Sequence, residues 1–344
     1  MLTLPACRPV VRTQYLRDRR NHCSHLQSVA NRKGDVGEKE CAIVKQGLSR
    51  IVTHMSEAPR FVTGSTLRHV TVMTATSSLG LMAVFFVDVL NLLYISMLGH
   101  QELAAAIGYS GTLMFFLTSV AIGLTIATTA QVSRALGSGD TAKAAELGGA
   151  GLILMLATMI VVTAAMMAFT RPMLELIGAT GETLDIAVRF MLMVVPSMPL
   201  MAVGMSAAGL LRAKGDARRS MYVTLFAAFA TAILDPILIF GFNLGMDGAA
   251  IATNLSRLML LGVGLYGVIN VHRMIAMPSA STLKLAARPY FAIGLPAVMT
   301  QLATPVGNAF VTREVASFGD QAVAGWAIIG RITPVAFGAI FALS

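Results

Sequence analysis

The chain has little charge and few cysteines for its length of 344 residues. Only 12% of its residues are charged, whereas a soluble domain usually carries about 25%. Its three cysteines, Cys7, Cys23 and Cys41, lack the paired C-x-x-C spacing of a metal or redox site, so we expect unstructured thiols in a reducing compartment. We also find no nucleophile–base pairing and no cluster of metal-ligating residues in the sequence. An enzyme is therefore not expected.

Long stretches of the chain contain no Asp, Glu, Lys or Arg. The shortest of the four longest stretches has 22 residues, and about 20 apolar residues are enough to span a bilayer as a helix. A buried helix of a soluble protein could mimic one such stretch, but not four. The sequence therefore predicts an all-α polytopic membrane protein. The four stretches are 103–133, 147–170, 190–211 and 289–312.

The net charge of +9 is concentrated in the amino-terminal tail, residues 1–67. That tail holds 11 Lys/Arg against 5 Asp/Glu, and it has no apolar run long enough for a secretory signal peptide. We expect it to be disordered, and we do not expect nucleic acid as a partner. Met55 opens a normal short lead-in to the first span, so residues 1–54 are hypothesised to lie upstream of the true start.

Apolar periodicity and loop charge predict eight spans and their direction. Three of the connections carry nine Lys/Arg, whereas the opposite connections carry only Arg171. This bias predicts that the amino terminus and the basic loops face the cytoplasm. The predicted spans are 70–98, 104–130, 147–170, 186–211, 220–241, 248–271, 289–316 and 322–344.

Two predicted spans carry a lone aspartate, Asp88 in the first and Asp235 in the fifth. A charge in a lipid-spanning helix is costly unless something binds it, so each acid is a candidate functional residue. Thr231 lies one helical turn from Asp235, and Thr253 lies one turn from Arg257 in the sixth span. We expect these spans to surround one polar cavity in the outer half of the membrane. The alternative is that Asp235 and Arg257 form an ion pair that only locks the bundle.

Prolines and glycines inside the spans predict bends and close packing. Each proline removes a backbone donor and favours a kink, which is tolerated where a cavity or a neighbour satisfies the freed carbonyl. Gly262–Gly267 has the G-x-G-x-x-G spacing but lies inside an apolar span, so it predicts helix packing and no dinucleotide site. The predicted kink positions are Pro196, Pro199, Pro236, Pro296 and Pro305.

A shift of 220 residues aligns 98–105 with 318–325, and both segments join an outward span to an inward one. The repeat predicts two lobes of equal orientation. Residues 68–273 form a six-helix first lobe, 274–288 form a cytoplasmic linker between the lobes, and 289–344 form the first two helices of a second lobe. On this register the second lobe is truncated, with four more spans expected.

Several segments, in this order and spacing, resemble the multidrug and toxic compound extrusion (MATE) transporters. The likeness covers about 68–344 and is most specific in the fifth and sixth spans. The segments are Leu98–Gly99 with Leu103–Ala106, Ala130–Gln131 with Ala135–Asp140 and Lys143–Ala144, Leu211–Asp216, Ile233–Gly241, and Gly245–Thr253.

The resemblance implies an antiporter of the bacterial-type inner membrane that exports amphipathic, often cationic small molecules in exchange for H⁺ or Na⁺. Asp235 and an acid of the first span would be the coupling site, with Asn91, Thr231 and Thr253 supplying ligands or hydrogen bonds and Arg257 tuning the charge. The resemblance places the acid of the first span at position 91, which is Asn91 in this chain. The aspartate of this span, Asp88, lies one turn earlier. We expect membrane lipid to surround the protein. We expect no cofactor, no metal beyond Na⁺ at Asp235 and no obligate protein partner.

Three departures from the family pattern follow from the same alignment. Besides the exchange of Asp and Asn in the first span, Thr231 replaces an asparagine, which removes a carbonyl ligand for Na⁺. Thr76 replaces the usual proline of the first span. The alternatives are a lipid-linked oligosaccharide flippase, for which only Arg257 and Arg331 qualify as pyrophosphate-binding cations, and a membrane fragment that does not transport.

Overall fold

The computed structural model describes residues 66–97 and 101–341, and all the regular structure in these ranges is helical. The predicted tail lies outside the described residues except for Thr66 and Leu67, which begin the first helix. The predicted natural start near Met55 also falls outside them.

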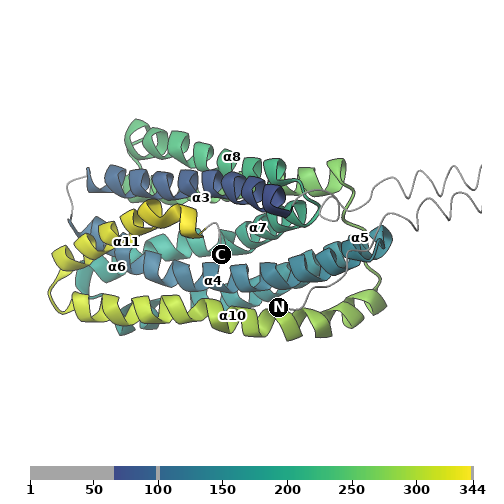
Figure 1. Cartoon of the computed structure of the whole chain (residues 1–344). Coiled ribbons are helices and arrows are strands. Elements are labelled where there is room, and N and C mark those ends of the chain that lie inside the picture. The colour runs from purple at the N-terminus through teal and green to yellow at the C-terminus, as the bar shows by residue number, and fades with distance from the viewer. Residues whose placement is uncertain (1–65, 98–100, 342–344) are drawn as a thin grey trace, which may run out of the picture. The chain divides into compact units, whose positions relative to one another are not determined.

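The described helices form eight consecutive segments, in agreement with the predicted order of spans (Figure 1). The bounds are α3 Thr66–Ser96, α4 Gln101–Gly137, α5 Thr141–Leu176, α6 Gly181–Val194 with the 3₁₀ turn η1 Val195–Ser197 and α7 Met198–Ala213, α8 Ala217–Pro236 with the π turn η2 Ile237–Gly241, α9 Gly245–Tyr266 with the π turn η3 Gly267–Val271, α10 Ala280–Ala316, and α11 Asp320–Phe341.

In the described ranges, six of these segments are long and apolar enough to cross a membrane, and they are the six spans predicted for the first lobe. The chain is therefore a multi-pass membrane protein. Helices α10 and α11 occupy the seventh and eighth predicted spans and are not among these six. Polar residues such as Gln301, Thr304 and Asn308 lower the apolarity of α10.

The turns between helices follow from glycine–aspartate pairs. Gly139 and Gly215 adopt φ of +82° and +86°, a left-handed conformation that other L-residues avoid. The aspartate that follows each glycine caps the next helix. Asp140 accepts from the backbone N–H of Lys143 at 2.9 Å, and Asp216 accepts from that of Arg219 at 3.1 Å.

Helix α4 is the centre of the packing, because α5, α6, α7, α10 and α11 all contact it. It packs tightly against α10, where a Cβ added to Gly123 would lie 2.6 Å from Cα of Val298. Thr112 and Thr312 join the same two helices through their hydroxyl groups at 3.4 Å. The seam between α4 and α10 therefore joins the first six helices to the seventh.

The segment after α9 lies against α5. The backbone N–H of Ala276 donates to the carbonyl of Ala145 at 3.0 Å, and the carbonyl of Met274 faces Gly148, where a Cβ would lie 2.5 Å from it. Helix α10 then begins at Ala280, earlier than the predicted 289. Ser279 caps this start by accepting from Thr282 N–H at 3.1 Å, and the helix continues through Pro289 without a break.

Two of the three glycines of the G-x-G-x-x-G segment, Gly264 and Gly267, pack against α7, in agreement with the predicted helix packing. A Cβ on Gly264 would lie 3.0 Å from Cβ of Ala207, and one on Gly267 would lie 3.1 Å from Leu211. Gly262 faces open space.

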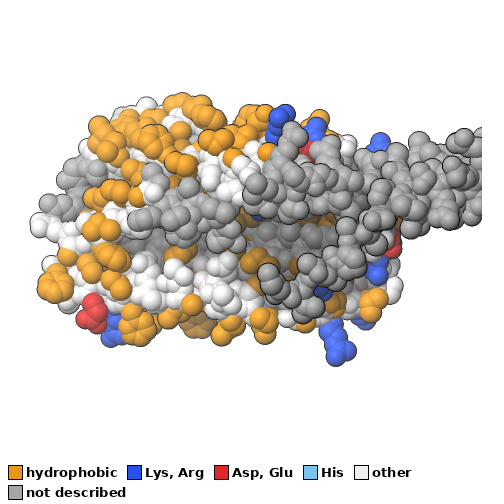
Figure 2. Space-filling view, viewed as in Figure 1, with side chains coloured by type: hydrophobic (Ala, Val, Ile, Leu, Met, Phe, Trp, Pro, Cys, Tyr) orange, Lys and Arg blue, Asp and Glu red, His pale blue; other side chains and the backbone are white. Residues whose placement is uncertain are grey.

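Large apolar side chains are exposed along α8, which lies at the top of the view in Figure 2. This distribution is the one expected of a helix that faces lipid acyl chains. The exposed residues on α8 are Tyr222, Phe226, Phe229 and Ile233.

Candidate functional site

Asp235 lies in the last turn of α8 and is fully buried. Nδ2 of Asn91, on α3, donates a hydrogen bond to its Oδ2 at 2.7 Å. Its other oxygen, Oδ1, has no hydrogen-bond partner among the described residues. A buried ionised carboxylate needs a partner for each oxygen. The unpaired oxygen is thus open to a proton or to a cation.

Asp88 lies one turn before Asn91 on α3 and is exposed. The backbone carbonyl of Asp88 accepts a hydrogen bond from Nη1 of Arg331, on α11, at 2.7 Å. The Asp88 carboxylate interacts electrostatically with Arg331, Arg257 and Asp235. The structure therefore gathers four charged groups from α3, α8, α9 and α11.

The two predicted threonine ligands use their hydroxyl hydrogens within their own helices. Thr231 donates to the carbonyl of Ala227 at 3.1 Å, and Thr253 donates to that of Ala249 at 2.9 Å. Neither threonine has a described hydrogen bond to Asp235. Each hydroxyl oxygen keeps lone pairs that could still accept a hydrogen bond or bind a cation.

The alternative of an Asp235–Arg257 ion pair is wrong. Arg257 is buried, and its Nη1 donates instead to the carbonyl of Val194 at 2.8 Å and to Oγ of Ser197 at 2.7 Å. The carbonyl of Val194 lacks its helical donor because, in the 3₁₀ turn η1, the N–H of Met198 donates to the carbonyl of Val195 instead. Asn254, one turn before Arg257, donates to the carbonyl of Met193 at 2.9 Å.

The predicted kinks differ in what the structure shows at each proline. Pro196 lies in the 3₁₀ turn between α6 and α7, next to Pro199 in the first turn of α7, so this span is interrupted as predicted. Pro236 ends α8 and is followed by a π turn. Pro296 and Pro305, in contrast, lie inside the continuous helix α10.

Helix α3 is also continuous at Thr76, the position where the resemblance implies a proline. Its hydroxyl donates to the carbonyls of Val72 at 2.8 Å and Met73 at 3.0 Å. Such a bond from a threonine to the preceding turn bends a helix slightly, without removing a backbone donor.

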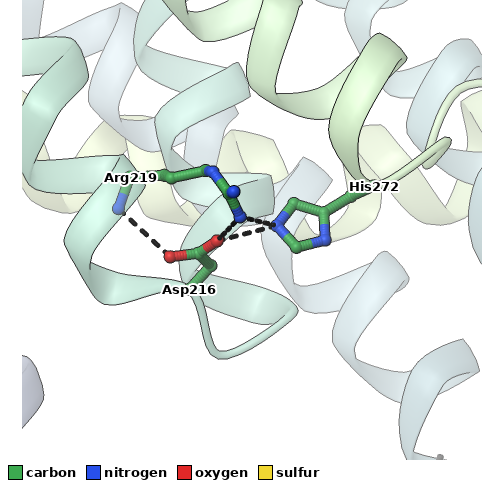
Figure 3. A network of polar contacts seen from close by, with 3 residues as sticks. All are labelled: Asp216, Arg219 and His272. Carbon is green, nitrogen blue, oxygen red and sulfur yellow. Dashed lines mark hydrogen bonds and ion pairs between the residues drawn. The ribbon is translucent and has the colours of Figure 1, made fainter.

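A second polar network, which the sequence analysis did not identify, joins the start of α8 to the end of η3 (Figure 3). Oδ2 of Asp216 contacts Nη1 of Arg219 at 2.6 Å and Nε2 of His272 at 2.8 Å. Burial raises the pKa of Asp216, but the hydrogen bonds from His272 and Arg219 outweigh burial and hold the pKa below its ordinary value of 3.8. In the sequence, the Gly-Asp pair at 215–216 indicates a helix cap. Nothing in the sequence indicates that His272, 56 residues later, contacts Asp216.

An apolar bundle of spanning helices defines the class of polytopic membrane proteins, and a buried acid in one of those helices marks a candidate functional site. The MatE family profile matches residues 66–237, half of the chain, and the chain belongs to this family.

Named relatives agree with this assignment. The FAD transporter of Shewanella oneidensis is 29% identical over 278 residues, which cover 79% of this chain and 61% of that protein. The multidrug export protein MepA of Staphylococcus aureus is 26% identical over 252 residues, which cover 71% of this chain and 54% of that protein.

Solved structures show the same fold. The crystal structure of the D35N mutant of the Vibrio cholerae MATE transporter VcmN matches with a TM-score of 0.70 and 29% identity, covering 80% of this chain and 63% of that one. An outward-facing MATE family transporter matches with a TM-score of 0.73 and 21% identity. The predicted MATE-like bundle is thereby confirmed. The chain spans 54% to 63% of the length of the relatives for which coverage is given above.

Proposed function

We propose that the full-length protein is a proton-coupled exporter of small amphipathic molecules and that Asp235 carries the coupling proton. The observation that supports this most directly is the unpaired Oδ1 of a fully buried carboxylate in a spanning helix. A proton that enters from outside would neutralise Asp235 and compete with a cationic substrate in the same cavity. The two lobes would then rock to reopen the cavity inward.

The groups around Asp235 favour a proton over Na⁺. Hard cations are bound by several oxygen ligands. Here Oδ2 already accepts from the NH₂ group of Asn91, which offers a donor and no lone pair. The hydroxyl hydrogens of Thr231 and Thr253 are bound within their own helices. A proton needs only the one free oxygen of Asp235.

Two substrate classes are supported by the relatives, and they differ in charge. Similarity to the multidrug export protein MepA supports the export of drugs, and the acidic pair Asp88 and Asp235 would favour cationic ones. Similarity to an FAD transporter supports an anionic dinucleotide as the second candidate, and Arg257 and Arg331 provide cationic groups in the same cluster. The flippase alternative gains no support, because the chain belongs to the MatE family.

We further propose a location in a bacterial inner membrane with the amino terminus in the cytoplasm. Two contacts bring the three basic connections together. Ala276 N–H donates to Ala145 in the first turns of α5, and His272 contacts Asp216 at the start of α8. The nine Lys/Arg of these connections therefore lie at one end of the bundle, as the positive-inside rule requires.

Transport by the full-length protein in proteoliposomes tests the proposal. Efflux of a cationic dye and of FAD is measured under an imposed pH gradient or Na⁺ gradient. We expect the pH gradient to drive efflux and Asp235→Asn to abolish that drive. Asp247→Asn is the matched control, because the half-buried Asp247 on α9 already pairs with the exposed Arg189. Efflux driven by Na⁺ alone, or undiminished pH-driven efflux by Asp235→Asn, would contradict the proposal.

A further inference from the structure

One face of α11 is built to rest on the first six helices. Oγ1 of Thr183, on α6, donates to Oδ2 of Asp320 at 2.7 Å. Further along α11, a Cβ added to Gly108 of α4 would lie 3.3 Å from Cγ1 of Val323 and 3.1 Å from Cβ of Ala327. The face consists of Asp320, Val323, Ala327 and Arg331.

The spacing of these residues shows that they form a single face. Successive members are three or four positions apart, so they lie along one side of the helix. Val323 is fully buried, and both ends of the face are polar. Asp320 is bound at one end, and Arg331 donates to the Asp88 carbonyl at the other. The apolar middle provides packing, whereas the two polar ends fix the position of α11.

The two polar ends differ in their surroundings. Thr183 is neutral, whereas Arg331 reaches the cluster of Asp88, Asp235 and Arg257. No other charged residue faces this cluster from α4, which has none between 103 and 133. Attraction between the Arg331 guanidinium and the carboxylates therefore depends on how many of those carboxylates are ionised.

We propose that Arg331 is a positioning residue that links the charge of the Asp88–Asp235 site to the contact between α11 and the first lobe. This inference rests on the proposed function. While both carboxylates are ionised, they hold the guanidinium of Arg331 against α3. When a proton neutralises Asp235, part of this attraction is lost and α11 can separate from α3. A change of charge in the first lobe would thus become a movement of the second lobe.

Distances between spin labels test this link without any transport. Met97 and Phe318 are 66% and 82% exposed, and they lie at the same end of the antiparallel helices α3 and α11. Labels are placed at these positions in the full-length protein in lipid nanodiscs, with Cys7, Cys23 and Cys41 replaced. As the pH falls from 8.5 to 5, we expect the population with the longer distance to grow. Arg331→Gln should remove this pH response, and Arg331→Lys should keep part of it.

The matched control is Thr183→Ala, which removes the neutral donor to Asp320 at the other end of the same face. It should change the distance at every pH and leave the pH response intact. An unchanged pH response in Arg331→Gln, or an equal loss in Thr183→Ala, would overturn the inference. If Arg331→Gln fails to fold, Arg331→Lys and Asp88→Asn serve instead, because both keep the donor and the backbone acceptor. Because no substrate or gradient is used, a wild-type protein that does not transport but still responds to pH would contradict only the proposed function.

Discussion

Asn91 on α3 and Asp235 on α8 are joined by a hydrogen bond of 2.7 Å, although 144 residues separate them in the chain. The bond fixes one oxygen of the acid and leaves the other unpaired. It also ties the first span to the fifth, whose helices pack against each other. The state of the acid and the packing of α3 on α8 are therefore coupled through one amide group.

Replacing Asn91 with alanine should shift the pH dependence of efflux to higher pH. The amide stabilises the ionised form of Asp235, so its loss makes the buried carboxylate harder to ionise. The measurement is the pH of half-maximal efflux in proteoliposomes. Asn270→Ala is the control, because Asn270 is exposed in η3. A shift to lower pH would show that Asn91 does not donate to the charged form.

The seam between α4 and α10 predicts opposite effects for two glycines of one helix. Gly123→Ala places a methyl group 2.6 Å from Cα of Val298 and should cost about 1 to 3 kcal/mol of stability through overpacking. Gly111 on the same helix has no such neighbour within 4 Å, so Gly111→Ala should stabilise by up to about 1 kcal/mol. Thermal unfolding in detergent distinguishes the two. Equal effects would contradict a tight seam at Gly123.

The linker after α9 predicts a change in protease sensitivity. In Gly149→Ala the added methyl group would overlap the carbonyl oxygen of Ala276 and displace the linker from α5. We expect faster tryptic cleavage after Arg273, which is exposed and lies just before the docked segment. Gly262→Ala is the control, because its methyl group meets open space. Cleavage at the wild-type rate in Gly149→Ala would show that the docking does not restrain the linker.

The spans could be predicted from the sequence because their signal is local. Stretches without charge have a length set by the bilayer, and the six spans of the first lobe appear where those stretches occur. The start of α10 was placed too late because Lys284 and Arg288 suggested a loop. Charged residues are tolerated in the first turns of a helix that extends beyond the apolar layer.

The contacts within the site could not be predicted, because they depend on which way each side chain turns. The sequence placed Asp235 and Arg257 at similar depths, and an ion pair was a reasonable alternative. The structure turns Arg257 toward the backbone carbonyl of Val194, which the 3₁₀ turn η1 leaves without a helical N–H donor. Charge attraction alone does not predict this choice, since a buried carbonyl also needs a donor.

The contact of Asp216 with Arg219 and His272 predicts a stabilisation that depends on pH. The pKa of Asp216 is lowered in the folded protein, so its contribution is present above about 3.8 and is lost as the pH falls further. At pH 7, Asp216→Ala should destabilise the protein by about 1 to 2 kcal/mol, because it also removes a helix cap. Thermal unfolding at pH 7 and pH 3 measures the difference. Asp185→Ala should have a smaller effect, because the Asp185–Arg171 pair is exposed.

A double-mutant cycle between Asp235 and Arg257 tests whether these two residues interact directly. Arg257→Gln removes the bonds to Val194 and Ser197 at the turn between α6 and α7. It should therefore lower the stability of the protein whatever residue stands at 235. Because the two side chains share no described hydrogen-bond partner, the effects of Asp235→Asn and Arg257→Gln on stability should add to within about 0.5 kcal/mol. The cycle is measured by denaturant unfolding in micelles. A coupling energy well above that value would restore the ion pair, with Arg257 acting directly on Asp235.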